Sequence, residues 1–335
     1  MKVRLADIAA ATGYSVNTVS HALRDLPDIS AAAKEKIRAA AAALDYIPNR
    51  QAGSFKSGRR GVIAVILPDI VNPHFTLLFH EAETYFQGLG VTSLFINTGE
   101  SPEEEERAVR TSIGQNVDGV ILCPTVGSRS AQLLLRAGIP YVLVGRHLGE
   151  EHDAVVTDDE EGGYLATRHL LSLGHTRIAC VRIDEEISSD RERYAGYLRA
   201  HSEQGLLPEP GMTLHLSPRA RENAAAIEGF LSSHPDCHAI FSFSDLLANE
   251  ILAVAIRMGR RIPEELSVVG FDRIEDASPL PLPLTTVGTR GDGLGLAAAR
   301  LLHKRTEGGT VGQKDRITLP VCLKVGSSSG EFKKN

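Results

Sequence analysis

The sequence predicts a small all-helical unit at the N-terminus, followed by a larger α/β unit made of two doubly wound lobes. Residues 5–44 carry apolar side chains at helical spacing. From residue 62 onward, short β-branched runs alternate with helical stretches, and the alternation restarts after residue 160. Such alternation is typical of parallel sheets with helices on both faces, and 335 residues suffice for two or three cores.

Two short helices that face each other across a sharp turn are predicted within residues 5–23. Their apolar positions recur at helical spacing and are Leu5, Ile8, Ala9, Val19, Ala22 and Leu23. Gly13 stands where the first helix must stop, and Ser15 can accept backbone N–H bonds at the start of the second. The pattern is that of a helix-turn-helix, whose second helix presents its N-terminal residues to the major groove.

Ser30 can cap a third helix that runs to about Leu44. Residues 46–58 then read Tyr-Ile-Pro-Asn-Arg-Gln-Ala-Gly-Ser-Phe-Lys-Ser-Gly. Together with the helix-turn-helix, this segment closely resembles the DNA-binding headpiece and hinge of the lactose-repressor (LacI/GalR) family of bacterial transcription regulators. The resemblance implies a headpiece over residues 1–46 and a hinge helix and linker over 47–60.

The charge distribution agrees with a DNA-binding head. Residues 1–60 hold ten Lys or Arg and five acidic residues, whereas the remainder holds 26 basic and 37 acidic residues. A basic head on an acidic body fits a phosphate-contacting module fused to one that does not touch DNA. A chance fluctuation over sixty residues is the alternative.

Composition excludes several other classes of protein. No apolar run is long enough to span a bilayer, and the N-terminus lacks a signal-peptide core, so we expect a soluble, cytoplasmic, nucleoid-associated protein. The four cysteines are scattered without a CxxC pair, so neither a structural metal nor a cofactor is expected. The segment 147–152 resembles a metal motif only with a spacing error, and we interpret it as a solvated loop.

The larger unit is predicted element by element from alternating patterns. Strands are expected at 62–67, 91–97, 117–123, 141–144, 154–157, 177–181, 212–216, 239–243, 266–271, 284–287 and 317–324. Helices are expected at 75–87, from 101 onward, and at 162–173, 190–204, 221–232, 246–258 and 291–307. Two doubly wound lobes follow, each of the size of one domain.

The resemblance extends over this larger unit. Its most specific patches in this unit are residues 162–164, 173–175, 193–197, 267–272 and 284–287. It implies a periplasmic-binding-protein-like effector and dimerisation domain over residues 61–326, whose chain crosses back between the lobes. The implied N-lobe is 61–160 with 290–319, the implied C-lobe is 161–289 with 320–326, and residues 327–335 read as a disordered tail.

The resemblance assigns DNA contacts to six residues of the head. Base contacts fall on Val16, Asn17 and His21, and phosphate contacts on Ser15, Thr18 and Ser20. The carboxamide of Asn17 can pair with adenine, and the apolar Val16 can pack on a thymine methyl. His21 stands where several family members carry Arg, which argues against a bidentate guanine contact. The alternative is that His21 is simply an exposed helix residue.

Pro48 and Asn49 can begin a short hinge helix that runs to about Lys56. Gly53 inside it costs about 1 kcal/mol of helix propensity. We therefore expect the hinge to form only when two copies pack over the minor groove. Phe55 matches the position of a Leu that, in the family, wedges between the central base pairs, and an aromatic wedge suits partial intercalation. Core packing is the alternative role of Phe55. Pairing of two heads implies a homodimer on a palindromic operator.

Effector binding is expected in a cleft at the carboxyl ends of the strands, where open sheets place ligands. Residues at such ends are Asp69, Phe75, Arg146 and Asp158 in the first lobe and Arg193, Ser244 and Asp272 in the second. The resemblance adds that Arg193 and Asp272 match positions that commonly hydrogen-bond the effector. Loop salt bridges and helix caps are equally open roles for Arg146, Asp158 and Ser244.

Carboxylates and guanidinium groups suit paired sugar hydroxyls, and Phe75 offers a stacking face. Purine-binding family members carry a further Arg where this chain has Ile187, so a carbohydrate or sugar phosphate is the expected effector. A nucleoside or purine, or a phosphorylated carrier protein acting as corepressor, are alternatives within the family. Ligand binding is expected to close the lobes and to change the spacing of the two hinge helices, which is a shift between populations.

Two readings from other classes remain less favoured. An enzyme lacks support because the sequence contains no GxSxG, GxxxxGK[ST], GxGxxG or HExxH motif. A sugar-binding module without a DNA role would need a signal peptide where this chain has its helix-turn-helix. The expected function is therefore a ligand-responsive transcriptional regulator, most simply a repressor.

Overall fold

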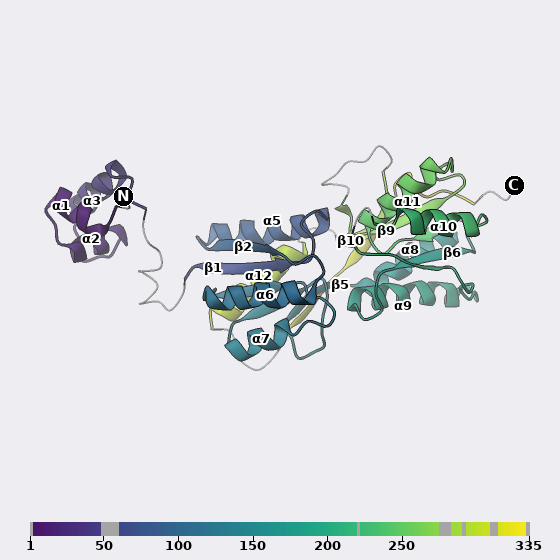
Figure 1. Cartoon of the computed structure of the whole chain (residues 1–335), viewed down its shortest axis with the longest axis horizontal. Helices are drawn as coiled ribbons and strands as arrows, with labels where there is room; N and C mark the ends of the chain where they lie inside the picture. The colour runs from purple at the N-terminus through teal and green to yellow at the C-terminus, as the bar shows by residue number, and fades with distance from the viewer. Residues whose placement is uncertain are drawn as a thin grey trace. The chain divides into compact units, whose positions relative to one another are not determined.

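The computed structural model describes residues 3–47, 60–219, 222–274, 283–289, 293–308 and 314–332. The chain divides into two compact units, residues 1–60 and 61–335, which are drawn in Figure 1. Each unit has its own buried core. The predicted hinge residues Asn49, Phe55 and Lys56 lie outside the described residues.

The first unit consists of α1 (Leu5–Thr12), α2 (Val16–Leu23) and α3 (Ala31–Ala43). Its core is made by fully buried side chains from all three helices, Ile8, Val19, Ala22 and Ile37. Gly13 ends α1 with φ +75°, a left-handed conformation that glycine adopts without strain. The Oγ atoms of Ser15 and Ser30 accept backbone N–H bonds at the starts of α2 and α3. These observations confirm the predicted helices and their caps.

The first lobe of the larger unit is built on a six-stranded sheet of order β11-β5-β4-β3-β1-β2, and we call it the N-lobe. Its strands are β1 (Val62–Leu67), β2 (Thr92–Asn97), β3 (Gly119–Leu122), β4 (Tyr141–Val144), β5 (Ala154–Thr157) and β11 (Arg316–Leu319). One face packs on α5 (Pro73–Gly88) and α12 (Leu294–Thr306). The other packs on α6 (Pro102–Gly114) and α7 (Ser130–Ala137).

The second lobe, the C-lobe, has a six-stranded sheet of order β12-β10-β9-β8-β6-β7. Its strands are β6 (Ile178–Arg182), β7 (Thr213–His215), β8 (Ala239–Phe241), β9 (Ser267–Phe271), β10 (Thr285–Thr289) and β12 (Val321–Lys324). One face packs on α10 (Ala224–Ser233) and α11 (Asp245–Arg257). The other packs on α8 (Asp159–Ser172) and α9 (Ser188–Glu203).

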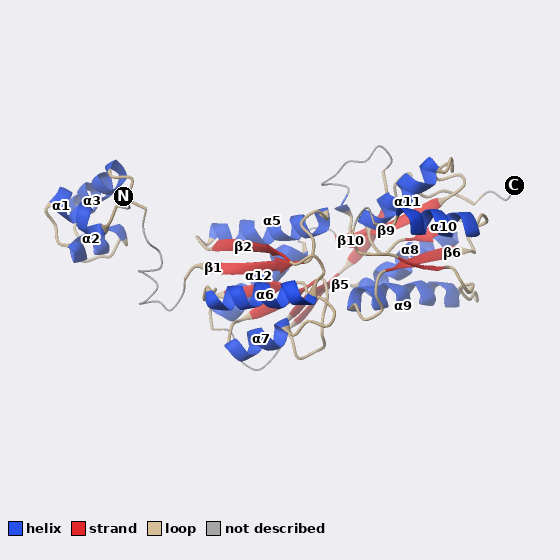
Figure 2. Cartoon of the chain, viewed as in Figure 1, coloured by secondary structure: helices blue, strands red, loops and turns tan. Residues whose placement is uncertain are grey.

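Figure 2 shows both sheets flanked by helices, as the alternating pattern predicts. The predicted single strand over 317–324 is wrong, because the segment is two strands separated by Pro320. β11 pairs in parallel with β5 of the N-lobe, whereas β12 pairs antiparallel with β10 of the C-lobe. The chain thus passes from one lobe to the other at this proline, and the second sheet is not wholly parallel.

The prediction missed α7 and the burial of one histidine. α7 has only eight residues and follows a stretch of Pro, Gly and Ser that signals a loop. Residues 147–152 form a loop, as predicted, in which Leu148, Glu150 and Glu151 are exposed, but His152 is buried and His147 is half-buried. The imidazole of His152 bonds the Tyr141 hydroxyl at 2.7 Å. Among the described residues, no His, Cys, Asp and Glu side chains group as a metal site would require.

The predicted disordered tail is wrong for residues 327–332. Ser328 is fully buried, and its Oγ donates to the Val268 carbonyl and accepts from the Thr285 N–H. The backbone of Phe332 donates to the Leu173 carbonyl. The polar composition of this segment suggested disorder, but its serines and glycines complete hydrogen bonds at the start of β9 and β10, within the C-lobe sheet. Within the described ranges, no helix is long and apolar enough to span a membrane.

Candidate functional sites

The N-terminal end of α2 exposes the side chains that the resemblance assigns to bases. Val16 is 47% exposed, and Asn17 is exposed beside it, whereas Val19, two positions after Asn17 and on the other side of the helix from it, is fully buried. Nearly half of Val16 is thus open to solvent. The helix therefore keeps one face for its core and leaves the other available for a partner.

Three hydroxyl residues frame this exposed helix end. The Oγ of Ser15 and the Oγ1 of Thr18 lie 2.8 Å apart, and Ser15 also accepts the Thr18 N–H at 3.1 Å. The third, Ser20, is half-buried. Because the Ser15 and Thr18 hydroxyls hold each other at the helix N-terminus, they form a polar, donor-rich edge of the kind that contacts phosphate oxygens.

The structure adds a residue that sequence reasoning missed in the head. The Oδ2 atom of Asp28, in the loop between α2 and α3, lies 2.6 Å from Nδ1 of His21. This hydrogen bond holds the pKa of Asp28 below its usual value. Seven residues separate the pair, so the contact depends on how the loop turns back over α2, and no periodic pattern signals it.

A cavity with about 550 Å³ of empty space lies between the N-lobe and the C-lobe. Its lining residues are Asp69, Asn72, His74, Phe75, Glu100, Cys123, Gly145, Arg146, Ser189, Arg193, Pro218, Phe243, Ser244 and Asp272. Six of the seven predicted effector residues are among them. Asp158 is not, because its side chain instead accepts the Glu161 N–H and caps α8.

Arg193 of α9 is the most densely bonded side chain of the cavity. Its Nε donates to Asp159 Oδ1 at 2.7 Å, and its Nη2 lies 3.6 Å from Asp272 Oδ1. Its Nη1 donates to the carbonyl of Phe243. The guanidinium also lies over the Phe271 ring, 3.5 Å from the ring centre. Burial raises the pKa of Asp159, and the facing Arg193 charge opposes that rise.

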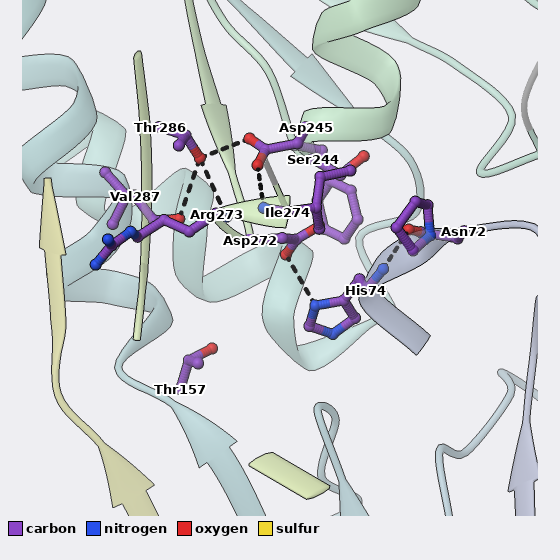
Figure 3. Close-up of polar contacts among 12 residues, drawn as sticks. Asn72, His74, Thr157, Ser244, Asp245, Asp272, Arg273, Ile274, Thr286 and Val287 are labelled. Atoms are coloured by element: carbon purple, nitrogen blue, oxygen red, sulfur yellow. Dashed lines mark hydrogen bonds and ion pairs between the residues drawn. The ribbon is translucent and has the colours of Figure 1, made fainter. Parts of the chain in front are cut away.

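Asp272 reaches the cavity from an unusual backbone turn after β9. Asp272 and Arg273 have φ values of +113° and +56°, which non-glycine residues rarely adopt. The buried Asp245 carboxylate holds this turn by accepting the Ile274 N–H at 2.9 Å and the Thr286 hydroxyl at 2.6 Å (Figure 3). Strained backbone of this kind is typical of functional sites.

His74 of the N-lobe faces Asp272 of the C-lobe, with 3.8 Å between Nδ1 and Oδ1 (Figure 3). Burial lowers the pKa of His74, and the nearby Arg193 and Arg146 charges lower it further against the opposing effect of Asp272. The imidazole is therefore neutral near pH 7. It also meets the Phe75 ring edge-on at 5.1 Å between ring centres, which keeps the Phe75 ring in place at the cavity wall.

Arg146 is held by Glu100, another residue that sequence reasoning missed. Two parallel hydrogen bonds of 2.8 and 2.7 Å join the guanidinium to the carboxylate, and Nη1 also donates to the Pro124 carbonyl. Glu100 follows the carboxyl end of β2, so the strand-end rule that selected the other residues was sufficient to find it. It was passed over because the adjacent Ser101 and Pro102 signal a helix start.

Ser244 takes the role of a helix cap and also lies at the cavity wall. Its Oγ accepts the Leu247 N–H as the cap of α11, and the residue also lines the cavity. Asp69 similarly accepts the Val71 N–H through Oδ1, a local turn that directs the carboxylate. In total the cavity wall holds three carboxylates, two guanidinium groups and a neutral imidazole, so its polar groups are nearly balanced in charge.

Both units match families of known proteins. Residues 4–49 match the family described as bacterial regulatory proteins, lacI family, and residues 60–324 match periplasmic binding proteins and the sugar binding domain of the LacI family. The transcriptional regulator DegA of Bacillus subtilis (strain 168) is 30% identical over 334 residues, covering 98% of each chain. The repressor PurR of Aliivibrio salmonicida (strain LFI1238) is 29% identical over 89% of this chain and 91% of its own.

A solved structure with a bound sugar is also similar. The transcriptional regulator CelR in complex with cellobiose is 29% identical, with a TM-score of 0.74 over 98% of this chain and all of that chain. These similarities span the head and both lobes, and they agree with the helix-turn-helix and the two-lobed cavity described above. The chain therefore belongs to the LacI family of bacterial regulatory proteins, and it is a ligand-responsive, DNA-binding transcription regulator.

Proposed function

We propose that the protein is a cytoplasmic transcriptional repressor that binds a palindromic operator as a homodimer and responds to a neutral carbohydrate in the cavity between its lobes. The observation that carries the choice of ligand is the pairing of both guanidinium groups in the cavity. Arg146 is paired with Glu100, and Arg193 with Asp159 and Asp272. Both guanidinium groups therefore already have carboxylate partners, and neither requires an anionic ligand to balance its charge.

A phosphorylated sugar would bring up to two further negative charges to a wall that already holds Asp69, Glu100 and Asp272. Hydroxyl groups, in contrast, both donate and accept, so they pair with carboxylates and guanidinium groups without adding charge. The Phe75 ring supplies an apolar surface for a sugar face. The cavity suits a purine less well, because this chain has a buried Ile187 at the position where the resemblance places an Arg in purine-binding members.

The cavity is lined from both lobes, so one ligand touches both at once. Phe75 and Arg146 belong to the N-lobe, whereas Arg193 and Asp272 belong to the C-lobe. A ligand that bridges these groups favours the closed arrangement over the open one in proportion to its difference in affinity for the two. The closed population then alters the spacing of the paired heads and hence the affinity for the operator.

The heads read DNA through the second helix. We assign base contacts to Val16, Asn17 and His21, and phosphate contacts to Ser15, Thr18 and Ser20. The hinge residues Asn49, Phe55 and Lys56 remain predictions from the sequence. Apolar side chains exposed near the start of α5, including Val71 and Leu77, suit an interface between two copies.

The ligand is tested by thermal shift of the full chain with neutral mono- and disaccharides, sugar phosphates and nucleosides, since a bound ligand stabilises by mass action. Neutral sugars are expected to raise the Tm, and Asp272→Asn is expected to abolish that rise while Glu264→Gln, an exposed carboxylate of the C-lobe, retains it. A rise with only sugar phosphates or only nucleosides would overturn the choice of a neutral sugar. A response only to a phosphorylated carrier protein would overturn direct ligand control.

Operator binding is tested by selecting DNA sites with the full chain and measuring affinity by fluorescence anisotropy. The selected sites are expected to be inverted repeats, with affinity falling steeply as salt is added. Phe55→Ala is expected to lose most specific affinity and to keep the ligand-induced rise in Tm. Unchanged operator affinity of that variant contradicts the wedge role, and a monomeric protein in sedimentation contradicts the dimer.

A further inference from the structure

The pair of His21 and Asp28 carries an inference about how the head distinguishes bases. His21 follows Asn17 by four residues, so both lie on the same face of α2. The His21 side chain is 23% exposed and that of Asp28 is 53% exposed, so the pair lies at the surface of the head. The 2.6 Å contact uses Nδ1 of the imidazole.

The position of Asp28 is determined by the loop between α2 and α3. The N–H of Leu26 donates to the His21 carbonyl, which turns the chain back at the end of α2. Asp25 adopts a left-handed φ of +59°, and its carboxylate is held by Arg38 at 2.6 Å and by Lys34 at 3.0 Å. Because α3 anchors the loop in this way, Asp28 is presented to His21 by the fold of the head.

A carboxylate only accepts hydrogen bonds, so the Nδ1 atom of His21 must donate to Asp28. Because Nδ1 is bonded to Asp28, Nε2 is the ring nitrogen that is available to a DNA base. In the neutral imidazole Nε2 is an acceptor, and in the protonated imidazole it is a donor. The charge of Lys34 on α3 also acts on Asp28 and lowers its pKa.

We propose that Asp28 is a positioning residue for operator recognition, which fixes the Nδ1–H form of His21 and so leaves Nε2 as the acceptor that His21 offers to a base. An acceptor matches the amino groups of adenine and cytosine in the major groove. The inference rests on the proposed contact of His21 with a base.

The experiment measures the affinity of the full chain for its selected operator and for versions that carry each base at the pair read by His21. That pair is located as the one at which His21→Ala removes the preference. For the unmodified protein, we expect a preference of about tenfold for adenine or cytosine over guanine.

Asp28→Asn is expected to blur the preference, because a carboxamide accepts from or donates to Nδ1 and no longer selects one form. The matched control is Glu35→Gln, which removes the same charge from an exposed position of α3. It is expected to change affinity equally for all bases. His21→Gln, whose carboxamide offers both a donor and an acceptor, is expected to lose the preference even if Asp28→Asn fails to fold.

The outcomes separate the inference from the function on which it rests. If His21→Ala alters no base preference, the proposed contact of His21 fails. If His21→Ala removes a preference but Asp28→Asn leaves that preference as in Glu35→Gln, the role of Asp28 is overturned. A preference of the unmodified protein for guanine at this pair also overturns it.

Discussion

The carboxylate of Glu192 in the C-lobe accepts a hydrogen bond from Nε2 of His147 in the N-lobe, at 2.7 Å. Arg316 on β11 of the N-lobe approaches the same Oε1 atom at 3.3 Å. The backbone N–H of His147 donates in addition to the Ser188 hydroxyl at the start of α9. One carboxylate thus joins two elements of the opposite lobe, at the boundary between the lobes.

Glu192→Gln is expected to lower the free energy of unfolding by about 1 to 3 kcal/mol near pH 7. This is the usual range for a hydrogen bond to a charged group. Burial alone would raise the pKa of Glu192, but the hydrogen bond and charge of His147, together with Arg316, outweigh it and hold the pKa below 4.5. The stabilisation is therefore present above pH 4.5 and is lost as the pH falls through the lowered pKa.

The measurement is the difference in Tm between the unmodified protein and Glu192→Gln from pH 3 to pH 7. The difference should be largest near neutrality and should shrink below pH 4.5. A difference that grows as the pH falls would show that the carboxylate is not stabilised by its partners in the other lobe.

Arg193→Ala is expected to destabilise the larger unit by about 3 to 5 kcal/mol, because it leaves the buried Asp159 carboxylate without its counter-charge. Asp159→Asn in the Arg193→Ala background is expected to recover part of that loss. Urea unfolding followed by circular dichroism measures both effects. If the second substitution adds to the loss instead, the two side chains do not act as a pair.

The close packing of α8 against α9 depends on two glycines. A Cβ on Gly163 would lie 2.0 Å from the Arg193 carbonyl oxygen, and one on Gly196 would lie 2.0 Å from the Glu160 carbonyl oxygen. Both contacts are with backbone, which cannot yield without separating the helices. Gly163→Ala and Gly196→Ala are therefore each expected to lower Tm strongly and to weaken ligand binding, since α9 carries Arg193.

The control for these substitutions is Gly229→Ala on α10, where a Cβ meets nothing within 4 Å. This change is expected to raise stability by up to about 1 kcal/mol, because alanine is the better helix former. Equal Tm values for the three alanine variants would contradict the close approach of α8 and α9.

Ser328→Ala is expected to cost about 1 to 3 kcal/mol, because the buried Thr285 N–H and Val268 carbonyl lose their hydroxyl partner. The neighbouring Ser327 is exposed, and only its backbone N–H is bonded, to the Pro283 carbonyl. Ser327→Ala is therefore expected to leave the Tm unchanged. If both variants melt together with the unmodified protein, residues 327–332 do not contribute to the C-lobe as the structure indicates.

Local patterns in the chain were enough for the three head helices, their caps at Ser15 and Ser30, and most of the alternating strands and helices. These features depend on near neighbours, since capping and amphipathic spacing act over a few residues. The strand-end rule also selected six of the residues that line the cavity, because parallel strands bring their carboxyl ends to one edge.

Only the folded chain decided which polar groups meet outside helical spacing. The pairing of Arg146 with Glu100 and the contact of His21 with Asp28 depend on turns and on side-chain reach, which leave no periodic trace. The same holds for the order in residues 327–332. Polar segments that read as disordered become ordered when neighbouring strands supply their hydrogen bonds, here at the start of β9 and β10, and the location of those strands is a property of the tertiary structure.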